Sequence, residues 1–228
     1  MKEHIQTTSP QSLEPDSRSA RTRRRITEAA TALFLEHGYL GTSMDQIAVR
    51  AGVSKPTVYR LWADKDALLE DIVRSTLDRA GDPFRAKLAA LAGSEDLRAD
   101  MQKLAREYVA MITQPSLLQL RRLVIGASHQ LPELAQAYYQ RAPEQTFRAL
   151  ADTFVQLADR GLLQIDDPLL TATHFAFLVL GRVLDKSLFY RDAPFSRREL
   201  DVQAHAGVEA FLRAYAPQLH ATDCVAKA

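Results

Sequence analysis

The sequence predicts an all-α protein with a small N-terminal domain and a larger C-terminal helical domain. Apolar residues recur with helical spacing along almost the whole chain, and no convincing run alternates polar and apolar residues as a half-buried strand would. Turn dipeptides typical of hairpins, such as Asn-Gly, are absent from the sequence. A length of 228 residues suits a small domain followed by a larger one.

The two ends of the chain are predicted to lie outside the folded domains. Residues 1–16 are polar, contain Pro10 and Pro15, and lack the apolar core of a signal peptide. We expect a disordered tail over residues 1–16 and a flexible tail over residues 217–228.

One longer helix and two short ones are expected in the N-terminal domain, residues 17–64. The first should run from Ser17 to His37 and end at Gly38, a residue suited to the left-handed C-terminal position. The second, residues 44–50, follows a capping-box spacing between Ser43 and Gln46. The third, residues 55–62, has Pro56 in its first turn, where a missing N–H costs little.

The C-terminal domain is expected over residues 65–216. A connecting helix over residues 65–80, capped by Asp64, should close or bend at the sequence Gly81-Asp82-Pro83. Further helices are predicted near residues 95–113, 116–129, 132–160, 168–190 and 196–216, with a kink at Pro143.

Charge is distributed unevenly along the chain. The net charge is only +1, yet residues 18–60 contain eight arginines and lysines against three acidic residues, which favours a polyanionic partner for that end. The longest apolar stretch, Leu169 to Gly181, is shorter than the roughly 20 residues of a membrane-spanning helix. With Cys224 as the only cysteine, the sequence predicts a cytoplasmic protein without an intrachain disulfide.

Residues 42–65 have the length and turn chemistry of a helix-turn-helix. Two short helices are joined by three residues that include Gly52, and Ile47 and Val58 could form the small core between them. The second helix would then expose cations, hydroxyls and one aromatic ring suited to a DNA groove: Lys55, Thr57, Tyr59 and Arg60. A capped helical hairpin inside an ordinary bundle is the alternative interpretation.

The same segment resembles the N-terminal signature of the TetR family of repressors over about residues 20–70. The matching positions are Gly38, Tyr39, Thr42, Ser43, Met44, Ile47, Ala48, Ala51-Gly52-Val53-Ser54, Tyr59-Arg60, Trp62, Lys65, Leu68 and Leu69. The sequence departs from the common pattern at Pro56, Leu61 and Trp62. The resemblance implies a repressor that binds a pseudo-palindromic, double-stranded DNA operator as a homodimer and is released by a small, largely apolar effector.

The resemblance also implies residue roles. Lys55, Pro56 and Thr57 would face base edges, and Thr42, Ser43, Tyr59 and Lys65 would hold phosphates. The predicted DNA-binding set is Thr42, Ser43, Ser54, Lys55, Pro56, Thr57, Tyr59, Arg60 and Lys65. The basic run formed by Arg21, Arg23, Arg24 and Arg25 is either an additional DNA-contacting arm or a solvated helix start.

Apolar stripes on the last two helices are candidates for a dimer interface in the form of a four-helix bundle. The predicted interface residues are Leu170, Phe177, Gly181, Leu184, Leu188, Ala204, Val208 and Phe211. Alternatively, both stripes pack inside one monomer.

An effector pocket is predicted between the C-terminal helices, although the same residues could form plain core. The predicted ligand-binding residues are Tyr108, Met111, Leu118, Arg122, Ile125, Phe147, Phe154, His174, Phe175 and Leu178. Arg122, His129 and His174 are the candidate polar anchors.

An enzyme and a helical scaffold that binds only proteins are the two alternative classes of function. The sequence contains no glycine-rich phosphate loop, HExxH or GxSxG motif, and its histidines lack metal-ligand spacing. We therefore expect no catalytic residues, no metal and no cofactor. A scaffold would leave the cationic and hydroxyl face of residues 55–65 without a role.

Overall fold

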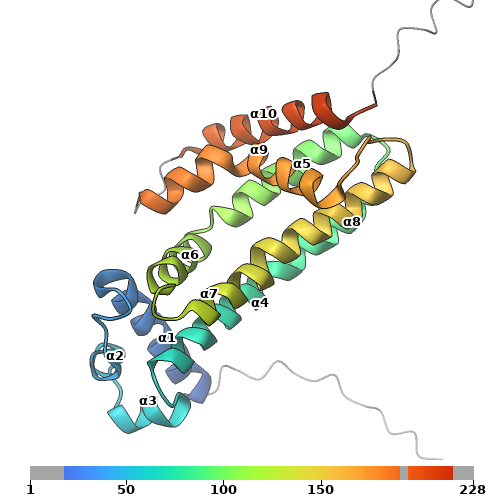
Figure 1. Cartoon of the computed structure of the whole chain (residues 1–228). Coiled ribbons are helices and arrows are strands. Elements are labelled where there is room, and N and C mark those ends of the chain that lie inside the picture. Colours follow the sequence, from blue (N-terminus) through green and yellow to red (C-terminus); the bar gives the residue numbers. More distant parts are fainter. Residues whose placement is uncertain (1–17, 191–194, 218–228) are drawn as a thin grey trace, which may run out of the picture. The chain divides into compact units, whose positions relative to one another are not determined.

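The computed structural model describes residues 18–190 and 195–217, and within these ranges every regular element is a helix (Figure 1). The expected tail over residues 1–16, and the expected tail over residues 217–228 except for residue 217, lie outside the described residues. The chain divides into two compact units, residues 1–69 and 70–228, and the division falls inside the fourth helix.

The N-terminal unit contains α1 (Arg18–His37), α2 (Met44–Ala51), α3 (Lys55–Leu61) and the start of α4 (Lys65–Ala92). Its core draws one or two large side chains from each helix. Ile26 and Phe34 of α1, Ile47 of α2 and Val58 of α3 are each at most 2% exposed. Trp62, which directly follows α3, is also buried, as its place in the sequence pattern suggests.

The fourth helix does not close where the sequence suggested. It continues as one helix through residues 81–83 to Ala92, rather than ending near residue 80. The continuation has a tertiary cause, because Phe84 is buried and stacks on Tyr108 with ring centroids 5.0 Å apart. Burial of an aromatic side chain outweighs the helix propensity lost at Gly81 and Pro83.

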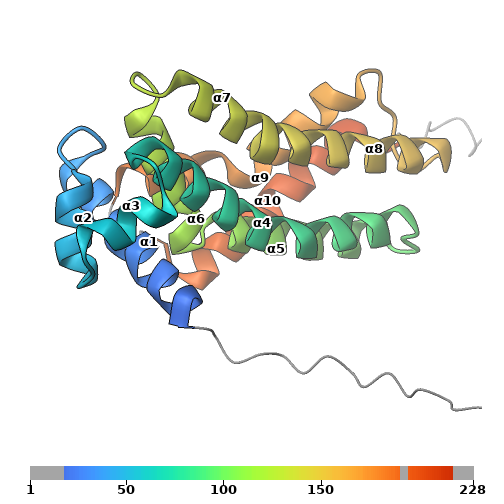
Figure 2. The same ribbon diagram turned by 90° about the horizontal axis from the view of Figure 1, so that it is seen from below.

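The C-terminal unit continues with α5 (Leu97–Ile112), α6 (Pro115–Ala127), α7 (Pro132–Tyr139), α8 (Gln145–Asp159), α9 (Pro168–Phe189) and α10 (Arg197–Tyr215). A single π-helical turn, η1 (Gln140–Glu144), joins α7 to α8, so that the two helices follow one another closely (Figure 2). Pro143 lies inside this turn, at the position where the sequence predicted a kink. Proline has no N–H to donate, and the wider turn accommodates it.

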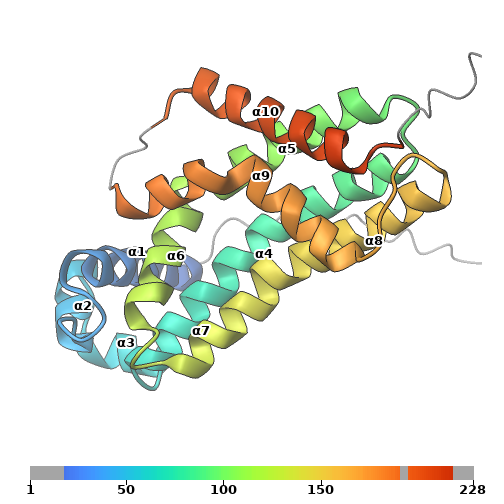
Figure 3. The same cartoon turned by 45° about the horizontal axis from the view of Figure 1, so that its top comes forward.

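Three phenylalanines form the centre of the C-terminal core. Phe154 of α8, Phe175 of α9 and Phe211 of α10 are completely buried, with ring centroids 5.2–5.5 Å apart. Helices α9 and α10 lie side by side (Figure 3), and their backbones approach closely at Gly207, where an added Cβ would come within 2.6 Å of the Leu178 carbonyl oxygen.

By length and composition alone, helix α9 is long and apolar enough to cross a membrane. Its apolar side chains are nevertheless used inside the unit, since Ala172, Phe175 and Val179 belong to the hydrophobic core. The helix is also interrupted at Gly181, whose backbone angles are not helical (φ 10°, ψ −108°). It is therefore a kinked core helix.

Candidate nucleic-acid interface and ligand cavity

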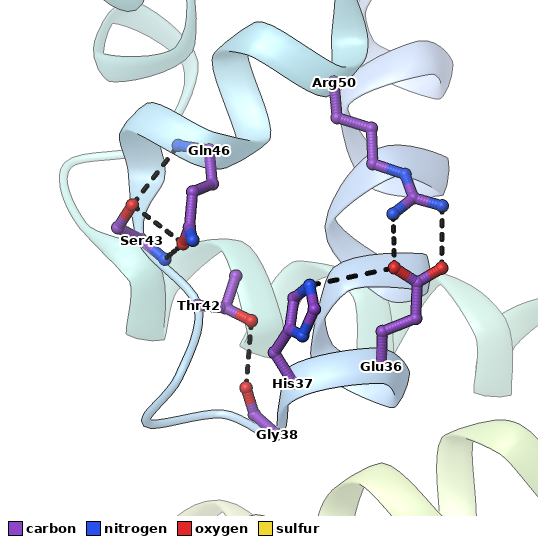
Figure 4. A network of polar contacts seen from close by, with 7 residues as sticks. All are labelled: Glu36, His37, Gly38, Thr42, Ser43, Gln46 and Arg50. Carbon is purple, nitrogen blue, oxygen red and sulfur yellow. Dashed lines mark hydrogen bonds and ion pairs between the residues drawn. The ribbon is translucent and has the colours of Figure 1, made fainter.

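The helix-turn-helix is organised by short-range hydrogen bonds at the two ends of α2. At the start, the Ser43 hydroxyl accepts from the Gln46 N–H at 3.2 Å, and the Gln46 side chain accepts from the Ser43 N–H at 2.7 Å (Figure 4). This reciprocal pair is the predicted capping box. At the end, Gly52 adopts the left-handed conformation (φ 62°), and its N–H closes the helix.

Helix α1 holds this turn from outside. The guanidinium of Arg25 donates to the carbonyl oxygens of Ala51, at 2.5 Å, and Gly52, at 3.2 Å. A Cβ at position 52 would lie 2.8 Å from Arg25 Nη2, the end of a flexible side chain that would have to shift, so it is chiefly the left-handed backbone angle that favours glycine here. The Arg25 guanidinium is therefore engaged in hydrogen bonds within the N-terminal unit. In this respect Arg25 differs from Arg21, an exposed member of the predicted basic arm.

A second link joins α1 to α2. Arg50 makes a bidentate ion pair with Glu36, with nitrogen–oxygen distances of 2.6 and 2.8 Å, and His37 lies 3.9 Å from the same carboxylate (Figure 4). The hydrogen bonds that Arg50 donates to Glu36 raise the pKa of Arg50 above its ordinary value. The pair is partly exposed, and its contribution is to orientation more than to stability.

The outward face of α3 carries most of the side chains predicted to contact DNA. Ser54, Lys55, Pro56 and Arg60 are exposed, and the Tyr59 side chain is 50% exposed. Thr57 is half-buried, and its hydroxyl lies 2.8 Å from the Ser54 hydroxyl. Ser54 occupies the N-cap position without making a side-chain cap bond, so its hydroxyl has remaining capacity for a ligand.

The structure places Thr42 away from this face. Its side chain is 2% exposed, and its hydroxyl donates to the Gly38 carbonyl at 2.9 Å (Figure 4). The prediction that the Thr42 hydroxyl holds a phosphate is therefore corrected, because burial and an internal bond occupy it. Ser43 remains exposed, although its hydroxyl is engaged in the capping box.

Lys65 is also largely engaged within the N-terminal unit. Its ammonium donates to the carbonyl oxygens of Tyr39, at 2.7 Å, and Thr42, at 2.8 Å, and lies 4.2 Å from the centroid of the Tyr39 ring. Burial lowers the pKa of Lys65. Since an ammonium has three N–H donors, only one remains for a phosphate, and the main role of Lys65 is to hold the loop between α1 and α2.

The C-terminal unit contains an apolar cavity of about 440 Å³. Side chains from α4 through α9 line it. Four of the predicted ligand-binding residues are among them: Tyr108, Met111, Ile125 and Phe147. Sequence reasoning missed several others, including Phe84, Leu88, Arg85, Arg121, Tyr138 and Gln145.

Six predicted ligand-binding residues do not line this cavity: Leu118, Arg122, Phe154, His174, Phe175 and Leu178. Phe154 and Phe175 belong to the packed aromatic core, and Leu118 is buried as well. Arg122 caps the C-terminal end of α9, where it donates hydrogen bonds to the carbonyl oxygens of Ser187, Leu188 and Tyr190. His174 pairs with the Tyr215 hydroxyl, and Leu178 is 38% exposed on the outside of α9.

The predicted dimer-interface residues divide into three groups. Ala204, Val208 and Phe211 are completely buried in the core of their own unit, which is the alternative that the sequence left open for them. Phe177, Leu184 and Leu188 line the cavity, and Phe177 is also 60% exposed. Leu170 is exposed, and Gly181 breaks α9 instead of permitting a close helix contact, which Gly207 provides.

Family models match both units of the chain. The model for bacterial regulatory proteins of the tetR family matches residues 26–72, and the model for the C-terminal domain of AefR-like transcriptional repressors matches residues 99–217.

Solved structures resemble the chain over most of its length. A TetR-family transcriptional regulator from Mesorhizobium loti MAFF303099 is 38% identical to this chain, with a TM-score of 0.77. The match covers 88% of this chain and 100% of the Mesorhizobium loti chain. A TetR-family regulator from Pseudomonas syringae pv. tomato str. DC3000 is 26% identical with a TM-score of 0.69, covering 86% and 97% of the two chains. The flavonoid-responsive regulator FrrA is 28% identical with a TM-score of 0.64, covering 87% and 98%.

Curated relatives match mainly at the N-terminal unit. The HTH-type transcriptional regulator YdeS of Bacillus subtilis (strain 168) is 44% identical over 55 residues, which are 24% of this chain and 28% of YdeS. YvkB of the same organism is 23% identical over 163 residues, 70% of this chain and 80% of YvkB. The chain thus spans under a third of YdeS. With one family model covering more than half of the chain, and a 38% identical structure covered in full, the chain belongs to the TetR family of transcriptional regulators, and it is not an enzyme.

Proposed function

We propose that this regulator is a repressor that binds a pseudo-palindromic operator as a homodimer through α3 and is released by a largely apolar small molecule. The observation that carries the DNA-binding part is the exposed face of α3, where Lys55, Tyr59 and Arg60 project from a helix held by the capped α2 and the Arg25-clamped turn. Cations and hydroxyls on such a helix suit phosphates and base edges in a major groove.

The DNA-binding part is tested by titrating the full-length protein with the duplex that lies upstream of its own gene. Replacing Lys55 by Ala should weaken operator binding by roughly ten- to a hundredfold if the side chain reads a base, and should reduce the preference over unrelated DNA. The matched control is Lys103→Ala, which removes one exposed lysine from α5. Equal effects of the two substitutions, or no binding by the parent protein, would contradict the proposal.

A second copy of the chain is the proposed partner for the outer faces of α9 and α10. Leu170 and Leu178 of α9 and Val202 of α10 are 50%, 38% and 62% exposed. Exposed leucine and valine side chains on two neighbouring helices are typical of a surface that a partner covers. Two copies would present two α3 helices to half-sites roughly 34–36 Å apart, or a multiple of that spacing.

The cavity supports the effector part of the proposal. Its volume of about 440 Å³ and its mostly apolar lining are typical of small-molecule sites. Two similar structures are described with small molecules: FrrA is a flavonoid-responsive regulator, and SmeT was solved as a complex with triclosan. Ring-containing compounds of similar size are therefore reasonable first probes for this chain. An effector that prefers the conformation with poorly spaced DNA-binding units would shift the population of dimers off the operator.

Release is measured by adding compounds to the preformed operator complex and recording both thermal stability and DNA affinity. A compound that raises the melting temperature of the free protein and weakens operator binding supports the effector role. A broad panel that changes neither quantity would leave a DNA-binding protein without a sensing function. We also propose a cytoplasmic location, where such a regulator has access to DNA.

A further inference from the structure

The polar residues around the cavity are unusually one-sided in charge. Three arginines, Arg85, Arg121 and Arg141, line the cavity together with apolar and aromatic side chains, and the described lining residues include no aspartate or glutamate. A cavity with low-dielectric walls strengthens every charge interaction inside it. The lining therefore favours a negatively charged occupant over a neutral or positive one.

Two of the three arginines already have partners. Arg85 donates to the side-chain oxygen of Gln145 at 2.8 Å, and Arg141 makes an ion pair with Asp78 at 2.7 Å. The Asp78 carboxylate offsets the charge of Arg141. Arg85 and Arg141 are also both exposed to solvent, which weakens their attraction for an anion, so neither is the natural anchor for a ligand.

Arg121 differs from both. Its Nε donates to the Tyr138 hydroxyl at 3.3 Å, and its two terminal nitrogens have no hydrogen-bond or ion-pair partner among the residues that the structure describes. The side chain is half-buried, and a cation in such a place without an anion is energetically costly. A guanidinium with both terminal nitrogens free is suited to a carboxylate or a similar anion.

Tyr108 supplies a second, independent sign of a ligand. The residue is 3% exposed and lines the cavity, yet its hydroxyl makes no hydrogen bond with any described residue. Among the described residues, the one fully enclosed side-chain polar atom without a partner is Gln102 Oε1, so the unpartnered Tyr108 hydroxyl is open to the space of the cavity, where a ligand can accept its hydrogen bond. Burial raises the pKa of Tyr108 well above its ordinary value, against the opposing charge of nearby Arg121, so the group remains a neutral donor at physiological pH.

We propose that the effector is an apolar organic acid whose anionic group binds the terminal nitrogens of Arg121, with the hydroxyls of Tyr108 and Tyr138 as additional donors. This inference rests on the proposed effector function and defines its ligand class. The apolar body of the acid lies against side chains such as Met111, Ile125 and Phe147. Tyr138 accepts a hydrogen bond from Arg121 and keeps its own proton to donate to the anion.

The test compares acids with amides of the same shape. Naphthalene-2-carboxylate is paired with naphthalene-2-carboxamide, and decanoate with decanamide, so that each pair keeps its apolar body and differs in the charge of one group. Binding to the full-length protein is measured by calorimetry without DNA. For at least one skeleton, the acid should bind roughly tenfold or more tightly than its amide, because charge-assisted hydrogen bonds are about twice as strong as neutral ones.

Four variants, one of them a control, locate the anchor. Arg121→Gln should abolish the preference for the acid while leaving amide binding within about twofold, and Tyr108→Phe should weaken acid binding by roughly three- to tenfold. Arg106→Gln is the matched control, since it removes an exposed arginine of α5 that does not line the cavity. Circular dichroism melting of each variant shows whether the fold is retained, and Arg121→Lys, which keeps the charge, should preserve part of the preference.

The outcomes separate this inference from the proposed function. If no acid binds more tightly than its amide, or if Arg121→Gln keeps the preference, the acid class is overturned. Operator binding is measured in a separate titration, and amides that bind and release the operator would then still support an effector function with a neutral ligand. Acid binding that depends on Arg121 supports the inference even if the acid leaves operator affinity unchanged.

Discussion

The ammonium of Lys55, at the start of α3, forms an ion pair with the carboxylate of Asp45 in the first turn of α2. Both side chains are more than half exposed, at 59% and 52%. Exposed pairs of this kind contribute about 0–1 kcal/mol, so a phosphate or a base edge can displace Asp45 without a large penalty. In the absence of DNA, the pair keeps the Lys55 side chain close to the start of α2.

We predict that Asp45→Asn tightens operator binding by roughly three- to tenfold at low salt. Lys55 then no longer has to give up the Asp45 carboxylate in order to bind DNA, and a negative charge near the DNA phosphates is lost. Fluorescence anisotropy with the operator duplex measures the effect. Asp152→Asn, at an exposed position on α8, makes the same change in net charge and should leave affinity unchanged. Weaker binding by Asp45→Asn would show that the pair orients Lys55 productively.

The basic arm should divide into a DNA-contacting part and a structural part. Arg21 is exposed, and its replacement by Ala should leave thermal stability unchanged. The slope of log K against log[salt] should become less steep by roughly 0.9 for each arm that loses a phosphate contact. Arg25→Ala should instead destabilise the protein by about 1 kcal/mol, because the Ala51 and Gly52 carbonyls lose their donor. Affinity over a salt series and chemical denaturation distinguish the two. An unchanged salt slope for Arg21→Ala would remove the arm from the interface.

Dimerisation should depend on the exposed apolar side chains of α9 and α10. The double substitution Leu170→Glu and Val202→Glu places carboxylates on both helices and should give a monomer in sedimentation at micromolar concentration. Operator affinity should fall with it, since one DNA-binding unit alone reads only one half-site. Val155→Glu, at a side chain of α8 that is 38% exposed, is the control and should remain dimeric. A dimer that survives the double substitution would place the interface elsewhere.

Acid stability should report on the link between α5 and α10. Hydrogen bonding from Arg98 lowers the pKa of Glu209. A carboxyl group whose pKa is lower in the folded state stabilises the fold above its unfolded pKa and loses this effect as the pH falls through the folded value.

Glu209→Gln should therefore lower the melting temperature at pH 7, and its difference from the parent protein should shrink between about pH 5 and pH 3. Melting curves across this range provide the measurement. Glu95→Gln, at an exposed loop position, should not show the same convergence. A difference that stays constant with pH would mean that the carboxylate charge is not what stabilises the contact.

Local features of the fold could be predicted from the sequence, because they depend on residues a few positions apart. The Ser43–Gln46 cap and the left-handed Gly52 are of this kind. The cavity could not be predicted as well. Arg121 and Arg122 are neighbours, but successive helical residues point about 100° apart, and only helix packing decides which one faces the cavity. Phe84 was missed because its helix was expected to close at the preceding glycine and proline, a local signal that tertiary burial overrides.

The π-helical turn η1 has a consequence for how this cavity can change through evolution. Such a turn contains one residue more than the regular α-helical ladder. Deleting one residue from positions 140–144 would restore the ladder and rotate α7 about its axis by about 100° against α8. Tyr138 would swing out of the cavity lining, and a different set of α7 side chains would take its place. A one-codon deletion could thus redirect the chemical preference of the regulator without altering its aromatic core.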